Sequence, residues 1–101
     1  MKVYYGKIYL PHINYTVRIR PHKTPPASIR GAGAWVRSDD KFGCTIYLHK
    51  NETPSSVAHE LVHVLRYICQ ERMMDFEHEE EHMAYIMQHL MGRVFGYKWA
   101  K

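Results

Sequence analysis

The sequence predicts an α+β fold in which a small β-sheet precedes two helices. In residues 1–50, apolar and polar side chains alternate within segments rich in β-branched and aromatic residues, a pattern typical of strands with one buried face. In residues 53–95, apolar side chains recur at helical spacing. A chain of 101 residues suffices for one hydrophobic core. We therefore expect a single domain over residues 1–101, with a β-rich half at 1–50 and a two-helix half at 53–95.

The expected sheet is small, twisted and mostly antiparallel, with three to four strands. Its strands are expected at residues 3–10, 15–20, 34–37 and 44–48. Residues 11–14 and 38–43 are polar or turn-forming and predict the connections within two hairpins. The proline-rich segment 21–27 predicts a loop between the hairpins.

The first helix has a clear start in the sequence. Threonine is a favoured N-cap and proline fits the first helical position, so Thr53 and Pro54 predict a helix that runs to Glu71 or Arg72. A second helix is expected over residues 76–94. Its expected apolar face consists of Met83, Ala84, Met87, Leu90, Met91 and Val94.

The net charge of +4 is unevenly distributed. Residues 1–50 carry nine Lys and Arg against two Asp, a balance of +7, whereas residues 51–101 carry five against eight acids, a balance of −3. A basic half can indicate nucleic-acid binding. The chain has no basic run and no nucleic-acid motif, however, so nucleic acid is not the partner that the sequence favours. A solvated sheet face, or a groove for acidic partners, is the simpler interpretation.

Two cysteines, Cys44 and Cys69, are too few for a disulfide framework, so we expect free thiols. The sequence shows neither a signal-peptide pattern nor a long apolar run. We therefore expect a cytoplasmic protein without a membrane partner. The sequence says nothing about oligomeric state.

The most informative segment is His-Glu-Leu-Val-His at residues 59–63. Residues four apart share a helix face, so His59 and His63 can reach one metal ion. Glu60 projects roughly 100° around the helix axis from His59, where it can polarise a metal-bound water without binding the ion. The surrounding apolar residues place the motif in the middle of the first helix: Ala58, Leu61, Val62, Leu65, Ile68 and Cys69. The sequence therefore predicts a zinc site.

A catalytic zinc site needs a third protein ligand and one open position. The extended pattern HExxHxxGxxH is absent, because Arg66 occupies its glycine position and Cys69 its third-histidine position. We expect the third ligand on the second helix, whose start is acidic. Glu81 is our choice because it lies beside the apolar stripe, and Glu80 is the alternative. His78 and His82 are also four apart, but they are more simply explained as solvated residues.

The motif at 59–63, followed by Glu81, Ala84 and Tyr85, resembles the gluzincin type of zincin-like metallopeptidases, particularly versions of about a hundred residues. The helical half is also similar to uncharacterised HExxH proteins encoded by bacteriophages, which would place the protein in a bacterial host cell. The resemblance covers residues 53–95. It implies a twisted sheet packed on an active-site helix, then a glutamate-bearing helix.

These residues predict a zinc-dependent peptidase acting on a peptide or protein substrate. Zinc held by His59, His63 and Glu81 would activate a water, and Glu60 would act as general base. Tyr85 or His82 would stabilise the oxyanion. By the same resemblance, an edge strand at 34–36 or 45–48 would bind the substrate by strand addition.

Two other functions are compatible with the sequence. The zinc could be structural in a module that binds protein or nucleic acid, although such a module has no need of Glu60. The peptidase could instead be latent, with the aromatic tail 97–101 covering the site.

Overall fold

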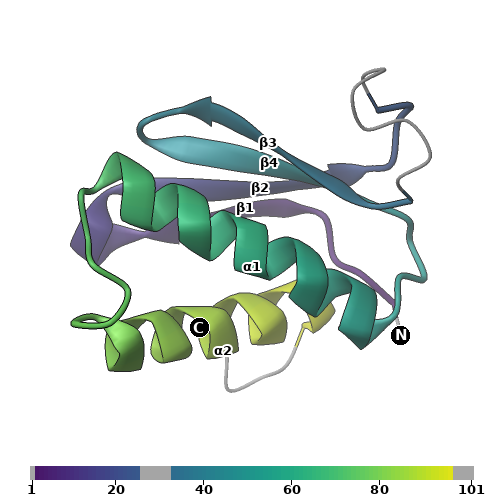
Figure 1. The fold of residues 1–101 in the computed structure, drawn as a ribbon. Helices are drawn as coiled ribbons and strands as arrows, with labels where there is room; N and C mark the ends of the chain where they lie inside the picture. The colour runs from purple at the N-terminus through teal and green to yellow at the C-terminus, as the bar shows by residue number, and fades with distance from the viewer. Residues whose placement is uncertain (1, 26–32, 97–101) are drawn as a thin grey trace.

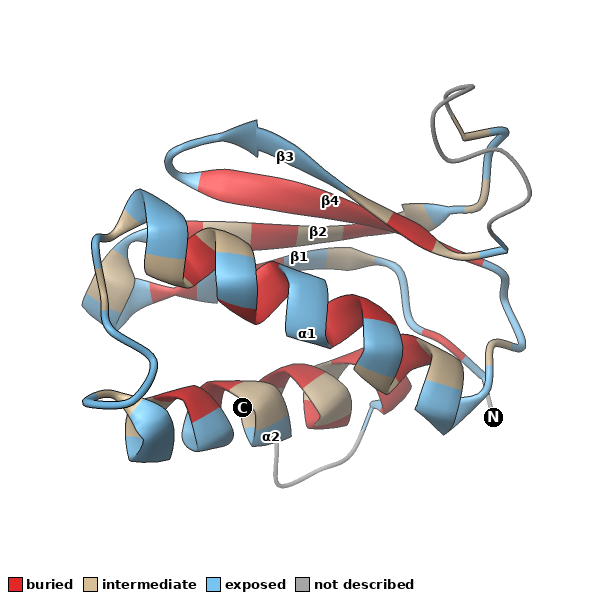
Figure 2. Ribbon diagram, in the orientation of Figure 1, coloured by how far each residue is buried: buried red, intermediate tan, exposed pale blue. Residues whose placement is uncertain are grey.

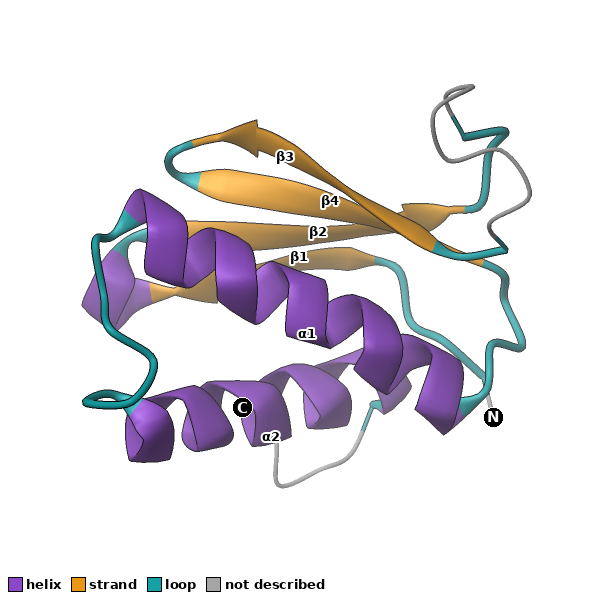
Figure 3. Ribbon diagram, in the orientation of Figure 1, coloured by secondary structure: helices purple, strands orange, loops and turns teal. Residues whose placement is uncertain are grey.

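The computed structural model describes residues 2–25 and 33–96 and confirms the α+β class (Figure 3). Its elements, in chain order, are β1 (Gly6–Leu10), a short 3-10 helix η1 (Pro11–Ile13), β2 (Tyr15–Pro21), β3 (Trp35–Asp40), β4 (Gly43–Leu48), α1 (Pro54–Glu71) and α2 (Glu80–Phe95). Every expected strand and helix is present. Part of the expected 21–27 loop and the 97–101 tail lie outside the described residues.

The sheet is mixed, with the strand order β1-β2-β4-β3. The two expected hairpins are antiparallel pairs, whereas β2 and β4 run parallel in the centre. The left-handed residue Asn14 ends η1 and turns the chain into β2. Because β4 lies between β2 and β3, the chain reaches the far edge of the sheet before it returns to the centre. This crossover leaves β3 as an edge strand.

Both helices cover the same face of the sheet (Figure 1). α1 lies against the β3 and β4 side, and α2 lies near β1, where the Tyr4 amide donates a hydrogen bond to the Val94 carbonyl at 2.8 Å. Inward-facing strand residues such as Val17, Ile19 and Ile46 are almost fully buried against the helices, as Figure 2 shows for the strands and helix faces. No helix of the described residues covers the opposite face.

Helix α1 begins as the sequence predicts. The Thr53 hydroxyl accepts a hydrogen bond from the Ser56 amide at 3.2 Å, and Pro54 is the first helical residue. The face that α1 buries contains Val57, Glu60, Leu61, Val64, Leu65 and Ile68. All of these except Glu60 are apolar, so burial of this stripe sets the rotation of the helix on the sheet.

Helix α2 starts four residues later than predicted. Residues 76–79 form turns, because the Asp75 carboxylate accepts a hydrogen bond from the Glu77 amide at 3.0 Å, a local bond that competes with the helix. Gly96 ends α2 in the left-handed conformation, at φ 71°, as glycine does at many helix ends. One predicted core position is wrong: Ala84 is exposed, whereas Ile86 is buried in its place.

Two further expectations concern the thiols and the membrane. Cys44 is buried and Cys69 half-buried, and both are free, as expected. Within residues 2–25 and 33–96, no helix has the length and apolar character needed to cross a bilayer.

The cap of α1 can be tested directly. Thr53→Ala removes the side-chain acceptor of the Ser56 amide, so we expect the free energy of unfolding to fall by about 0.5–2 kcal/mol in a urea titration. Thr53→Ser keeps the hydroxyl and is the matched control. Equal stability of Thr53→Ala and the wild type would show that this cap does not hold the start of the helix.

Candidate metal centre

Helix α1 brings His59, Glu60 and His63 together. Their candidate ligand atoms all lie within 4.8 Å of one another, and no other His, Cys, Asp or Glu group of this kind occurs in the described part of the chain. The two imidazole rings meet edge to face, with centroids 5.2 Å apart. A tetrahedral zinc with bonds of about 2.1 Å separates its ligands by about 3.4 Å, so small side-chain rotations would suffice. Two imidazoles beside a carboxylate are a donor set that suits zinc.

The three residues differ in burial. His59 and His63 are exposed, whereas Glu60 is buried at the edge of the apolar stripe, with 6% of its surface accessible. Burial raises the pKa of Glu60, the neighbouring His63 and His59 lower it, and Glu52 raises it. The site therefore combines two accessible imidazoles with a carboxylate in a partly desolvated position.

The edge strand β3 forms the opposite wall of the site. A cavity of about 480 Å³ lies between the motif and residues 33–36, and Ser56 and Tyr67 of α1 line it as well. The expected edge strand at 34–36 thus lies beside the motif. The alternative at 45–48 is wrong, because β4 is paired on both sides with β2 and β3.

The structure does not bring Glu81 or Glu80 to the histidines. Helix α2 packs against α1 through Leu65 and Cys69, and the Cys69 thiol lies 3.7 Å from the Met83 sulfur. Leu65 is two residues after His63, or roughly 200° around the helix. Glu80 lines a groove between α1 and α2 on this flank, and Glu81 is exposed on the first turn of α2. The helix that was expected to supply the third ligand therefore lies on the wrong flank of α1.

Tyr85 and His82 also lie away from the motif. Both line a separate cavity of about 310 Å³ between α2 and η1, together with His12 and His89. Tyr85 is 63% exposed there. His78, the other member of the rival histidine pair, contacts the Asp75 carboxylate at 2.7 Å.

Two residues that the sequence argument overlooked line the cavity of the motif. Glu52 is half-buried, and its carboxylate accepts a hydrogen bond from the His49 amide at 3.1 Å. Tyr67 is half-buried and lies one turn of α1 after His63. Helical spacing could have indicated Tyr67, which follows His63 by four residues, but not Glu52, which lies before the N-cap Thr53 and outside α1.

No protein family, curated protein or solved structure matches this chain. The interpretation of the site therefore depends on its own geometry and chemistry.

The metal site makes a direct prediction. Wild-type protein supplied with zinc should bind one ion per chain in native mass spectrometry, and His63→Ala should lose it because one of the two accessible imidazoles is gone. The bound ion should also raise the melting temperature of the wild type, since a ligand of the folded state stabilises it.

The control for this experiment is the double variant His78→Ala and His82→Ala, which removes the rival pair outside the motif. It should keep the ion. Zinc that stays with His63→Ala and leaves the double variant would assign the metal to the His78 and His82 pair.

Proposed function

We propose that this protein is a zinc-dependent metallopeptidase with His59 and His63 as metal ligands and Glu60 as general base. The observation that carries the proposal is the arrangement of these residues on α1. Two imidazoles and one buried carboxylate converge at a cavity whose opposite wall is an edge strand. A purely structural metal site would not require a carboxylate held beside the open coordination position.

Glu60 has the properties of a general base. When bound, zinc supplies Lewis-acid polarisation of the scissile carbonyl and of the attacking water. The Glu60 carboxylate accepts the proton of the water and delivers it to the leaving amine. Its partly desolvated position raises its pKa, which brings the carboxylate closer to the range in which such transfers are efficient near neutral pH.

Tyr67 takes the role that the sequence suggested for Tyr85. The tetrahedral oxyanion needs a hydrogen-bond donor in the same cavity. Tyr67 lines that cavity one turn beyond His63, whereas Tyr85 lines another. A phenol is a suitable donor, so Tyr67 is the candidate for oxyanion stabilisation in this proposal.

The substrate would be an extended peptide. An edge strand offers unpaired backbone groups, to which a peptide can add as a further strand. β3 is such a strand and borders the cavity at Trp35 and Val36. The described lining includes the carboxylates of Glu52 and Glu60 and no Lys or Arg, so these two carboxylates would balance the charge of a bound zinc and favour neither acidic nor basic substrate segments.

The proposed base is tested by Glu60→Gln. This nearly isosteric change removes the proton acceptor and leaves both imidazoles in place, so we expect full zinc occupancy and at least a hundredfold loss of peptide hydrolysis. The measurement is cleavage of a fluorogenic peptide library by zinc-loaded protein, with metal content determined on the same sample. Cleavage by Glu60→Gln at the wild-type rate would refute the mechanism.

The contribution of Glu52 to zinc binding is tested by a matched pair of variants. Because Glu52 lines the cavity of the motif and Glu81 does not, Glu52→Gln should weaken zinc binding by about 10–100-fold, whereas Glu81→Gln should leave it unchanged. Competition with a chelating dye measures both affinities. The opposite result, with zinc lost in Glu81→Gln alone, would mean that α2 moves across α1 when the metal binds.

A further inference from the structure

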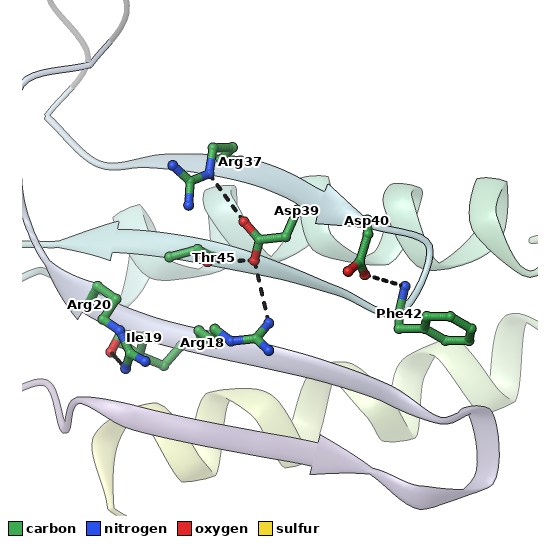
Figure 4. A network of polar contacts seen from close by, with 8 residues as sticks. All are labelled: Arg18, Ile19, Arg20, Arg37, Asp39, Asp40, Phe42 and Thr45. Carbon is green, nitrogen blue, oxygen red and sulfur yellow. Dashed lines mark hydrogen bonds and ion pairs between the residues drawn. The ribbon is translucent and has the colours of Figure 1, made fainter.

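The face of the sheet that lies opposite the helices carries a group of arginines (Figure 4). Arg18 and Arg20 project from β2 and Arg37 from β3, while the residues that alternate with those of β2, Val17 and Ile19, are buried against the helices. A shallow hollow of about 380 Å³ lies between the three arginines. No helix of the described residues covers this face, so its cations are open to a partner.

The strand register aligns these cations in a row. Lys7 of β1 is opposite Arg18, Arg18 is opposite Thr45, and Thr45 is opposite Arg37. Adjacent strands are about 4.8 Å apart, so the row extends about 14 Å across the sheet. Arg20 adds a further cation two residues along β2. The cations are thus distributed over all but one of the strands instead of surrounding a single point.

One carboxylate holds two of the arginines in place. Asp39 accepts hydrogen bonds from the Arg37 Nε at 3.1 Å and from the Thr45 hydroxyl at 2.7 Å, and it lies 3.5 Å from Arg18. The Arg18 and Arg37 side chains nevertheless remain 36% and 50% exposed. Asp39 orients both guanidinium groups, and Asp40 also lines the hollow, so three arginines there face two carboxylates and leave a net charge of +1.

From this arrangement we propose that the open sheet face binds single-stranded nucleic acid through its phosphates. A row about 14 Å long fits a chain of regularly spaced anions better than a single anion. The guanidinium group of arginine can donate two hydrogen bonds to the oxygens of one phosphate. A flat sheet face has no helix or loop that could enter a duplex groove, whereas a single strand can lie across it.

The lining of the hollow favours nucleic acid over an acidic protein. Besides charged residues, it contains Thr45 and Tyr47. The Tyr47 ring is 6% exposed, stacks on Trp35 at 4.3 Å and lies beneath Lys23. The hollow therefore has no exposed apolar anchor of the kind that protein partners use. Because Tyr47 is the only ring in the described lining of the hollow and is buried, binding within the hollow depends on phosphate charge and not on base sequence.

The experiment measures fluorescence anisotropy of a labelled 12-nucleotide oligothymidylate titrated with the full chain at several salt concentrations. We expect micromolar affinity that falls steeply with salt. Removing two phosphate contacts with Arg18→Gln and Arg37→Gln together should weaken binding at least tenfold and reduce the slope of log K against log salt by about 1.4. Arg18→Lys with Arg37→Lys keeps the charge and should retain most of the affinity.

The matched control is Arg66→Gln with Arg93→Gln, which removes the same charge from the two helices. It should bind the oligonucleotide like the wild type, and circular dichroism checks that both double variants are folded. An equal loss in the control would mean that net charge alone attracts the strand and would overturn the proposal. Tighter binding of a labelled polyglutamate peptide than of the oligonucleotide would also overturn it, in favour of an acidic protein partner.

Discussion

The structure depends on the burial of one apolar stripe of α1 against the sheet. Leu61, Val64 and Ile68 are fully buried, and their contact with the inward side chains of β4 and β2 determines how the helix is rotated. Once that rotation is set, the positions of His59 and His63 follow, because residues one turn apart share a face. The position of the candidate metal centre is therefore a consequence of core packing. Any change that rotated the helix would turn both imidazoles away from the cavity.

The two flanks of α1 have different neighbours: the candidate metal ligands lie on one flank, and the contacts with α2 lie on the other. One flank faces the edge strand β3 and carries the histidines. The other contacts α2 through Leu65, Cys69 and Met83. Glu60 occupies the boundary between the core and the first flank, where it is desolvated yet adjacent to the cavity. In this position the Glu60 carboxylate has a raised pKa although the domain is too small to form a deep cleft.

The two faces of the sheet are divided in a similar way. The inner face supplies the core, and the outer face carries the arginines around Asp39. These cations are far apart in the sequence: Lys7, Arg18 and Arg37 come from three different strands. The sequence therefore contains no basic run, and these cations come together on one face only when the strands pair.

The sequence by itself determined the elements and the motif, because these depend on local spacing. Alternation predicted the strands, Thr53 and Pro54 predicted the start of α1, and four-residue spacing placed His59 and His63 on one face. Tertiary structure alone decided what lies beside that face. From the sequence, the two flanks of the apolar stripe are equivalent, so nothing local indicated that α2 would pack on the flank away from the histidines and carry Glu81 with it. The crossover that makes β3 an edge strand is equally non-local, since it depends on which strands pair across the sheet.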